Sequence, residues 1–165
     1  MLNSDLPLVY WDACVPLAYI NGEANRLPHI QGLLQDSGKN IQIVTSILSI
    51  TEVAFAKVEQ DGKSPDADTE AKINKLWEIG SPIETVEFYE LIAEDAKKLM
   101  RAGLPHGFSL KPADAIHLAT ADRLQVTEFH TYDDVKLSNF SQFTKTKFPI
   151  IQPTARQAVI LPALP

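Results

Sequence analysis

The sequence predicts an α/β fold, with helices on both faces of a central, mainly parallel sheet of four or five strands. Short apolar segments rich in β-branched residues alternate along the chain with longer segments that carry apolar residues at helical spacing. The 165 residues are enough for one domain with its own core, and 45% hydrophobic and 22% charged residues are typical of a globular protein. We therefore expect one domain over residues 1–152 and a proline-containing tail over residues 153–165.

Five short apolar runs predict the strands. The first run stops abruptly at Asp12, as expected for a buried central strand with an acid at its carboxyl end. The third run contains Pro82, which favours a position near the edge of the sheet because proline donates no backbone hydrogen bond. The expected strands are residues 8–11, 41–45, 82–86, 127–132 and 148–151.

Apolar residues at intervals of three and four predict helices between these strands. Asn21, Gly22 and Pro28 divide the region after the first strand into two short helices. Residues 60–68 contain Asp, Gly, Ser and Pro in the pattern of a loop. The expected helices are two within residues 16–35, then 48–55, 71–79, 88–102 and one that begins near residue 112.

An acid lies in the first turn of the helix that begins near residue 112. Pro112 suits the first helical position because its missing N–H would have had no partner within the helix. Asp114 then faces the positive end of the helix dipole. Taken alone, this acid is more readily explained by the electrostatics of a helix end than by a function.

Three further acids stand at similar boundaries between predicted elements. Asp12 follows the first strand, and Asp133 follows the fourth, with Asp134 beside it. Each of these has an ordinary explanation as a helix N-cap or a turn residue. Glu52 shares a helix face with Leu48 and Phe55 and should point inward, where it must be paired, protonated or bound to a metal unless it reaches the rim of that face.

Together these acids resemble the motifs of the PIN domain family of metal-dependent nucleases, over roughly residues 8–150. The sequence Asp-Ala-Ile-His-Leu-Ala-Thr-Ala from Asp114 is similar to the third acidic motif of the family, and Ser-Ile-Thr-Glu-Val-Ala around Glu52 is similar to the second. The first motif, a hydrophobic strand followed by an acid, matches the segment that ends at Asp12. In the last motif a strand gives a hydroxyl residue, a spacer and an acid, as Thr131 and Asp133 do here.

The resemblance implies a three-layer α/β/α fold whose acids form one catalytic and metal-binding site. In a parallel sheet, the carboxyl ends of strands and the amino ends of helices share one edge, so the acids can converge there. Mg²⁺ or Mn²⁺ would neutralise them, whereas zinc sites usually use Cys and His. The implied catalytic and metal-binding residues are Asp12, Glu52, Asp114 and Asp133, with Asp134 as a substitute for the last.

The implied activity is that of a Mg²⁺- or Mn²⁺-dependent endoribonuclease that hydrolyses RNA phosphodiester bonds. A metal activates water for such a reaction and stabilises the leaving oxygen. In this family such an enzyme is most often the VapC-like toxin of a bacterial toxin–antitoxin pair. The resemblance therefore also implies a cognate antitoxin as a partner, and a possible homodimer.

Ala13 and Cys14 depart from the family pattern, in which small hydroxyl residues follow the first acid. Support for the metal site would then come from elsewhere, and Ser46, Thr131 and His117 are the candidates. A lone imidazole on a packed helix is more often a supporting group than a catalyst. The departure also keeps a second interpretation open, a catalytically inactive PIN-fold binding module.

Basic residues cluster near Asp114, at the end of helix 88–102 and in the following loop. Lys97, Lys98, Arg101 and Lys111 complement the helix dipole there, and beside a metal site they would also guide RNA phosphates. The net charge of −6 argues against a protein that coats nucleic acid non-specifically through many basic contacts. It does not exclude a nuclease, because two divalent ions would make an acidic site attractive to phosphate.

The sequence also bears on location. No apolar run approaches the ~18 residues that a membrane span needs, and the residues before the first strand lack the features of a signal peptide. Cys14 is the only cysteine, so no internal disulfide can form, which agrees with a reducing compartment. We expect a cytoplasmic protein with no membrane partner.

Overall fold

Five parallel strands form the centre of the molecule. The computed structural model describes residues 6–155, and its sheet has the strand order β3-β2-β1-β4-β5, with every neighbouring pair parallel. The predicted parallel sheet is therefore confirmed, and so is the edge position of the strand after Pro82. The strands are β1 (Leu8–Trp11), β2 (Gln42–Ser46), β3 (Ile83–Val86), β4 (Glu128–His130) and β5 (Ile150–Ile151).

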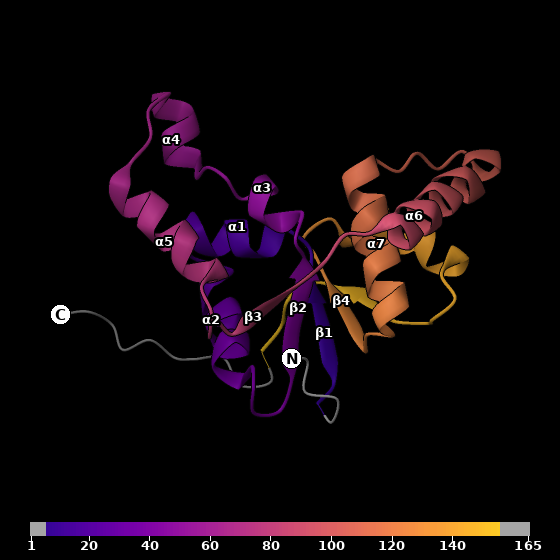
Figure 1. The fold of residues 1–165 in the computed structure, drawn as a ribbon, viewed down its shortest axis with the longest axis horizontal. Helices are drawn as coiled ribbons and strands as arrows, with labels where there is room; N and C mark the ends of the chain where they lie inside the picture. Colours follow the sequence, from indigo (N-terminus) through magenta and orange to yellow (C-terminus); the bar gives the residue numbers. More distant parts are fainter. Residues whose placement is uncertain (1–5, 156–165) are drawn as a thin grey trace.

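Helices cover both faces of the sheet, which makes the three layers of the predicted fold. Figure 1 shows α1, α2 and α5 on the left of the sheet and α6 and α7 on the right. The helices are α1 (Cys14–Ile20), α2 (Leu27–Asp36), α3 (Ser49–Glu52), α4 (Lys57–Gly62), α5 (Ala67–Trp77), α6 (Glu90–Gly103), α7 (Pro112–Leu124) and α8 (Asp134–Leu137). Two 3₁₀ segments, η1 (Leu104–His106) and η2 (Ser138–Phe143), complete the described elements.

The central strand β1 divides its side chains between two hydrophobic clusters. Val9 and Trp11 are buried in the cluster that contains Ile30 of α2, whereas Tyr10 is buried in the cluster that contains Leu118 of α7. This alternation follows from the two-residue period of a strand. It directs the Tyr10 hydroxyl toward the helix that carries Asp114.

The region after β2 differs from the sequence prediction. The helix expected over residues 48–55 ends at Glu52, and Phe55 is 53% exposed, so the expected common face of Glu52 and Phe55 does not exist. The loop expected over residues 60–68 is partly helical, because α4 extends to Gly62. Its buried Glu59 carboxylate accepts backbone N–H bonds from Ala56 at 2.9 Å and Asp66 at 2.8 Å, and these two residues are the N-caps of α4 and α5.

The helix α7 agrees with the sequence prediction. It begins at Pro112, carries Asp114 in its first turn and ends at Leu124, where Gln125 adopts a left-handed conformation with φ of 54°. Its small residues Ala115 and Ala119 are fully buried against the sheet. The first turn of α7 therefore lies at the carboxyl edge of the strands.

Two other expectations concern the ends of the chain and the membrane. Residues 156–165 of the predicted tail lie outside the described residues, so the proposed domain boundary near residue 152 stays a prediction. Among residues 6–155, none of the helices has the length and apolar character needed to cross a membrane.

Candidate active site

The four predicted acids come to the carboxyl edge of the sheet from four different elements. Asp12 directly follows β1, and its backbone N–H donates to the carbonyl of His130 at the end of β4. Glu52 ends α3, which follows β2, and Asp114 lies in the first turn of α7. Asp133 follows β4 and caps α8. The structure arranges them as two pairs, each gathered around one side-chain nitrogen.

Asp12 and Glu52 form the first pair, around the imidazole of His117. The Nε2 atom of His117 lies 2.6 Å from Glu52 Oε2 and 3.8 Å from Asp12 Oδ1. His117 is completely buried on α7, one turn after Asp114. Its ring therefore joins two acids that are 40 residues apart in the chain.

A hydrogen-bond chain connects His117 to the backbone of β2. The backbone N–H of Ser46 donates to Tyr10 Oη at 2.9 Å, and Tyr10 Oη lies 2.8 Å from His117 Nδ1. Burial raises the pKa of Tyr10 far above its usual range, so the phenol keeps its proton. Through Nδ1 and Nε2, the ring of His117 therefore connects Tyr10 to Glu52.

Thr131 connects the two pairs. Its Oγ1 donates to Asp12 Oδ2 at 2.7 Å and accepts the backbone N–H of Asp133 at 3.0 Å. The hydroxyl residue of the fourth motif thus positions the acid of the first motif and the backbone of its own acid.

Cys14 contacts the same Asp12 oxygen, at the place where the family pattern has a hydroxyl. Its Sγ donates to Asp12 Oδ2 at 3.3 Å and accepts the backbone N–H of Tyr132 at 3.3 Å. Burial, reinforced by the charge of Asp12, raises the pKa of Cys14 to about 12. The thiol therefore stays protonated and supplies a weak donor to Asp12.

Asp114 and Asp133 form the second pair, around the ammonium of Lys136. Lys136 Nζ lies 2.9 Å from Asp114 Oδ2 and 3.4 Å from Asp133 Oδ2. The hydrogen bond to Asp114 raises the pKa of Lys136, so the lysine remains charged. Sequence reasoning missed this residue, although its position one turn after Asp133 on the same segment is a usable signal.

Two predicted candidates stand apart from these pairs. The Asp134 carboxylate accepts a hydrogen bond from Gln152 at 3.2 Å and has no contact with the other predicted acids within residues 6–155. The Ser46 hydroxyl accepts the backbone N–H of Leu48 at 3.2 Å, so Ser46 reaches the site only through its own N–H to Tyr10.

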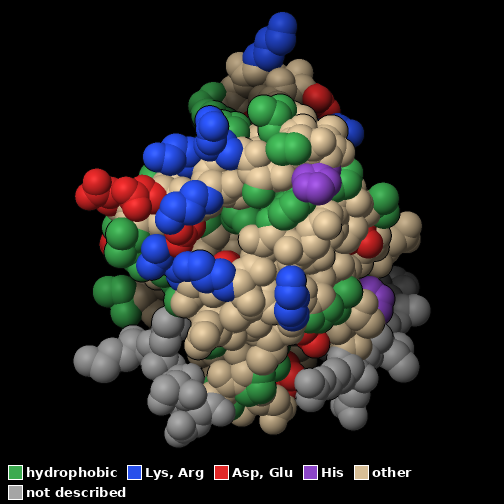
Figure 2. All heavy atoms as spheres, turned by 90° about the vertical axis from the view of Figure 1, so that its right-hand side faces the viewer, with side chains coloured by type: hydrophobic (Ala, Val, Ile, Leu, Met, Phe, Trp, Pro, Cys, Tyr) green, Lys and Arg blue, Asp and Glu red, His purple; other side chains and the backbone are tan. Residues whose placement is uncertain are grey.

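The predicted basic residues lie on the side of the molecule formed by α6 and α7. Figure 2 shows Lys and Arg side chains gathered on this face, despite the net charge of −6. Lys97 and Arg101 border a cavity of about 280 Å³ next to Ile116, two residues beyond Asp114. Lys98 instead pairs with Asp95 at 3.0 Å, and Lys111 is the N-cap residue of α7.

The donor set fits a hard divalent ion, although no site is preformed. Within residues 6–155, no three Asp, Glu, His or Cys side chains stand close enough to hold one ion. The acids instead face an imidazole nitrogen and an ammonium, and the position of the ammonium between Asp114 and Asp133 is compatible with a cation at this pair. Carboxylate oxygens are the ligands that Mg²⁺ and Mn²⁺ prefer. Turning two or more of them from these nitrogens toward one ion would complete the site.

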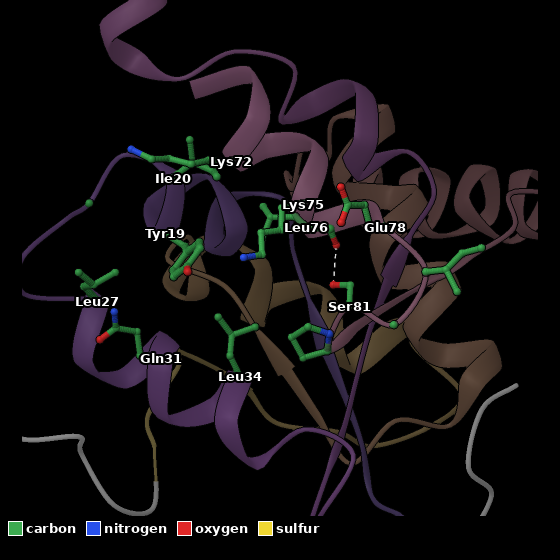
Figure 3. Close-up of a pocket in the computed structure, with 14 residues that line it drawn as sticks. Tyr19, Ile20, Leu27, Gln31, Leu34, Lys72, Lys75, Leu76, Glu78 and Ser81 are labelled. Carbon is green, nitrogen blue, oxygen red and sulfur yellow. Dashed lines mark hydrogen bonds between the residues drawn. The ribbon is translucent and has the colours of Figure 1, made fainter. Parts of the chain in front are cut away.

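A second cavity lies on the opposite side of the sheet and contains none of the predicted acids. It has a volume of about 570 Å³ and is lined by α1, α2, α5 and the loop before β3. In Figure 3, Tyr19, Leu34 and Leu76 border it, and Ser81 donates to the Leu76 carbonyl at 2.6 Å.

Comparisons with known proteins agree with this architecture. The family model described as "PIN domain" matches residues 9–142. The structure of VapBC2 from Rickettsia felis bound to a DNA fragment from their promoter aligns with a TM-score of 0.61 and 16% identity, covering 87% of this chain and 96% of that one. The structure of FitAcB from Neisseria gonorrhoeae aligns with a TM-score of 0.63 and 13% identity, covering 88% of this chain and 97% of that one.

A search of curated protein sequences found no significant match. At these identities the structural matches establish the fold alone, and the family model establishes the relationship, because it spans most of the chain and contains all four acids of the two pairs. The chain belongs to the PIN domain family.

Proposed function

We propose that this protein is a Mg²⁺- or Mn²⁺-dependent endoribonuclease whose active site is formed by Asp12, Glu52, Asp114 and Asp133. One observation carries the proposal. Acids from four separate segments form two pairs at the carboxyl edge of one sheet, and Thr131 hydrogen-bonds to members of both pairs. Proteins of this family are generally nucleases, which agrees with an acidic site at this position.

The divalent ion would activate water for attack on the phosphodiester and offset the charge of the leaving oxygen. The chain's own groups orient the ligands. Thr131 and Cys14 donate to one oxygen of Asp12, and the imidazole of His117 lies within hydrogen-bond distance of the Glu52 carboxylate.

The basic face would bind the RNA backbone. Lys97, Lys98 and Arg101 lie on α6, and Lys111 precedes α7, three residues before Asp114, so these side chains could neutralise RNA phosphates near the site. Since the rest of the surface is acidic on balance, this face would orient RNA toward the site.

We further propose that the nuclease is the VapC-like toxin of a toxin–antitoxin pair and acts in the cytoplasm. The motif resemblance supports this role, as does the common fold with chains of the VapBC2 and FitAcB structures. A small cognate antitoxin would be its partner, and a homodimer is expected from the resemblance. Co-purification with the product of a small neighbouring reading frame tests the partner, and light scattering tests the dimer.

Cleavage of single-stranded RNA with Mg²⁺ or Mn²⁺ tests the enzymatic proposal. Asp12→Asn and Asp114→Asn should each reduce the cleavage rate by at least about 100-fold. Groups that only orient a metal ligand already contribute about 10–100-fold, and loss of the ligand itself should cost at least as much. Asp68→Asn, an exposed acid in the first turn of α5, is the control and should cut at the parental rate. If the two site variants cut as fast as the parent, the assignment is wrong. A folded parent that binds no divalent ion in calorimetry would favour the inactive binding module instead.

A further inference from the structure

Glu52 belongs to a helix that cannot hold its carboxylate in place by itself. The helix α3 has four residues, of which only Ser49 is buried, and within the described part of the chain no side chain caps its N-terminus. Helices much shorter than ~12 residues are not stable alone in water, because ordering the first turn costs more free energy than its few hydrogen bonds supply. The position of Glu52 must therefore come from contacts outside α3.

One such contact is made by His117 of α7. Its Nε2 lies 2.6 Å from Glu52 Oε2, and the ring is completely buried. Because the imidazole is planar and rigid, a hydrogen bond at one ring nitrogen determines where the other nitrogen points. Within residues 6–155, the hydrogen-bond partner of Nδ1 is the Tyr10 hydroxyl at 2.8 Å. This contact orients the ring whichever of the two atoms donates.

The Tyr10 side chain is itself firmly held. It comes from the central strand β1, is fully buried and stacks on Phe129 of β4, with the ring centroids 5.1 Å apart. Its hydroxyl accepts the backbone N–H of Ser46, the last residue of β2, at 2.9 Å. Ser46 and Glu52 lie at the two ends of the segment that contains α3. One hydroxyl therefore contacts the start of this segment directly and its end through His117.

We infer that Tyr10 is a positioning residue of the active site, whose hydroxyl fixes the Glu52 carboxylate at the edge of the sheet by joining Ser46 to His117. The inference rests on the proposed function, since it assigns the group that orients one ligand of that same metal site. Because Tyr10 is fully buried, it acts through His117 and not by contact with RNA.

Tyr10→Phe tests the inference because phenylalanine keeps the stacked ring and removes the hydroxyl. In the full chain without metal, the Ser46 amide loses its acceptor, so its hydrogen exchange, followed by NMR, should accelerate about tenfold relative to that of Val44 on the same strand. The affinity for Mn²⁺, measured by calorimetry at one fixed pH, should fall by about 10–100-fold, as expected when a group that orients a metal ligand is lost.

The kinetics of RNA cleavage should show which step the hydroxyl supports. In Tyr10→Phe, kcat should fall by about 10–100-fold, because Glu52 is no longer held in place. KM for RNA should stay within about twofold of the parental value, since a buried hydroxyl makes no contact with the substrate. Circular dichroism and urea unfolding verify that each variant is folded before it is compared.

A double-mutant cycle tests whether Tyr10 acts through His117. If it does, adding Tyr10→Phe to a folded His117→Ala variant should change the Mn²⁺ affinity by no more than about twofold, because the connection is already broken. Two independent losses that multiply would mean that the hydroxyl acts by another route, and the inference would fail.

Two further variants are the controls. Tyr19→Phe removes the same atom from α1, where Tyr19 borders the cavity of about 570 Å³ on the opposite side of the sheet. Its Mn²⁺ affinity and cleavage rate should equal those of the parent. Phe148→Leu weakens the packing of Phe129, on which both Phe148 and Tyr10 stack. It should lower the free energy of unfolding and leave the Mn²⁺ affinity of the folded protein unchanged.

The outcomes separate the inference from the proposed function. If the parent binds Mn²⁺ and cuts RNA, and Tyr10→Phe does both equally well, the inference alone fails. If Tyr10→Phe loses stability but keeps its Mn²⁺ affinity and kcat, as expected of Phe148→Leu, the hydroxyl is merely structural and the inference also fails. If the parent neither binds Mn²⁺ nor cuts RNA, the metal-dependent function fails, and the positioning role fails with it.

Discussion

The two pairs of acids are held in opposite ways. Asp12 and Glu52 face a fully buried imidazole that is fixed through Tyr10 to the backbone of β2. Asp114 and Asp133 face a lysine that is 38% exposed and belongs to a helix of four residues. The first pair is positioned by a buried ring held in a hydrogen-bond chain, and the second by a charged side chain that is partly exposed to solvent. Burial therefore orders the pair of Asp12 and Glu52, whereas a lysine charge balances the pair of Asp114 and Asp133.

The largest expected effect on stability comes from removing His117, which holds the pair of Asp12 and Glu52. His117→Ala leaves a cavity and removes the partner of both the Tyr10 hydroxyl and Glu52, so we expect a loss of about 2–4 kcal/mol in the free energy of unfolding. Urea denaturation followed by circular dichroism measures it. Lys136→Met should cost less than about 1 kcal/mol, because a half-exposed ion pair contributes little. If the two variants lost the same free energy of unfolding, the two pairs of acids would not differ in how firmly they are held.

The reactivity of the Cys14 thiol tests how far solvent reaches the surroundings of Asp12. With a pKa raised to about 12, only ~0.01% of the thiol is ionised at pH 8, against ~10% or more for a free cysteine. Raising the pH should accelerate labelling well beyond pH 9, where an ordinary thiol reaches its plateau. We expect alkylation at pH 8 to be at least about 100-fold slower than in a free cysteine peptide. Fast labelling of the folded protein would mean that solvent reaches Asp12 freely.

Thr131→Val tests the connection that Thr131 makes between the two pairs of acids. Valine keeps the shape but removes the hydroxyl that donates to Asp12 and accepts from the Asp133 backbone. Groups that hydrogen-bond to a metal ligand typically contribute about 10–100-fold to metal affinity or activity, so we expect RNA cleavage to slow by about 10–100-fold. Thr131→Ser restores the hydroxyl and should recover most of the rate. A slow serine variant would point to lost packing as the cause.

The smallest effect is expected at Asp134. Its carboxylate contacts Gln152 and neither of the two nitrogens that organise the site. Asp134→Asn should therefore leave the RNA cleavage rate within about twofold of the parent, since it removes a charge that contacts neither nitrogen and keeps an oxygen that can accept from Gln152. A large loss would mean that Asp134, instead of Asp133, is the fourth acid.

Local patterns predicted much of this architecture. Strand positions and the start of α7 follow from apolar runs and a helix-starting proline, signals that lie within a few neighbouring residues. The edge shared by the four acids follows from parallel topology. Which acid faces which partner does not, because the bond between Tyr10 and His117 joins residues 107 positions apart. Strand alternation places Tyr10 on one face, but only the packed fold determines that His117 meets it there.

The errors after β2 have a physical cause as well. The apolar spacing of residues 48–55 fits one helix, yet the chain turns after Glu52 and begins α4 at Lys57. The bonds from Ala56 and Asp66 to Glu59 stabilise that second helix, and neither is visible as an apolar pattern. Lys136 was missed for a similar reason, since a lysine after an acidic turn usually remains in solvent.

Glu59 also changes how acids in such a fold should be interpreted. Among residues 6–155 it is the one carboxylate counted as buried, at 6% exposure, and both of its oxygens are already used by peptide N–H groups. The acids at the sheet edge retain free oxygen lone pairs and an opening to water. Ranking carboxylates by burial alone would therefore select Glu59, which has a structural role. Oxygen lone pairs that accept no hydrogen bond are the better guide to a reactive carboxylate.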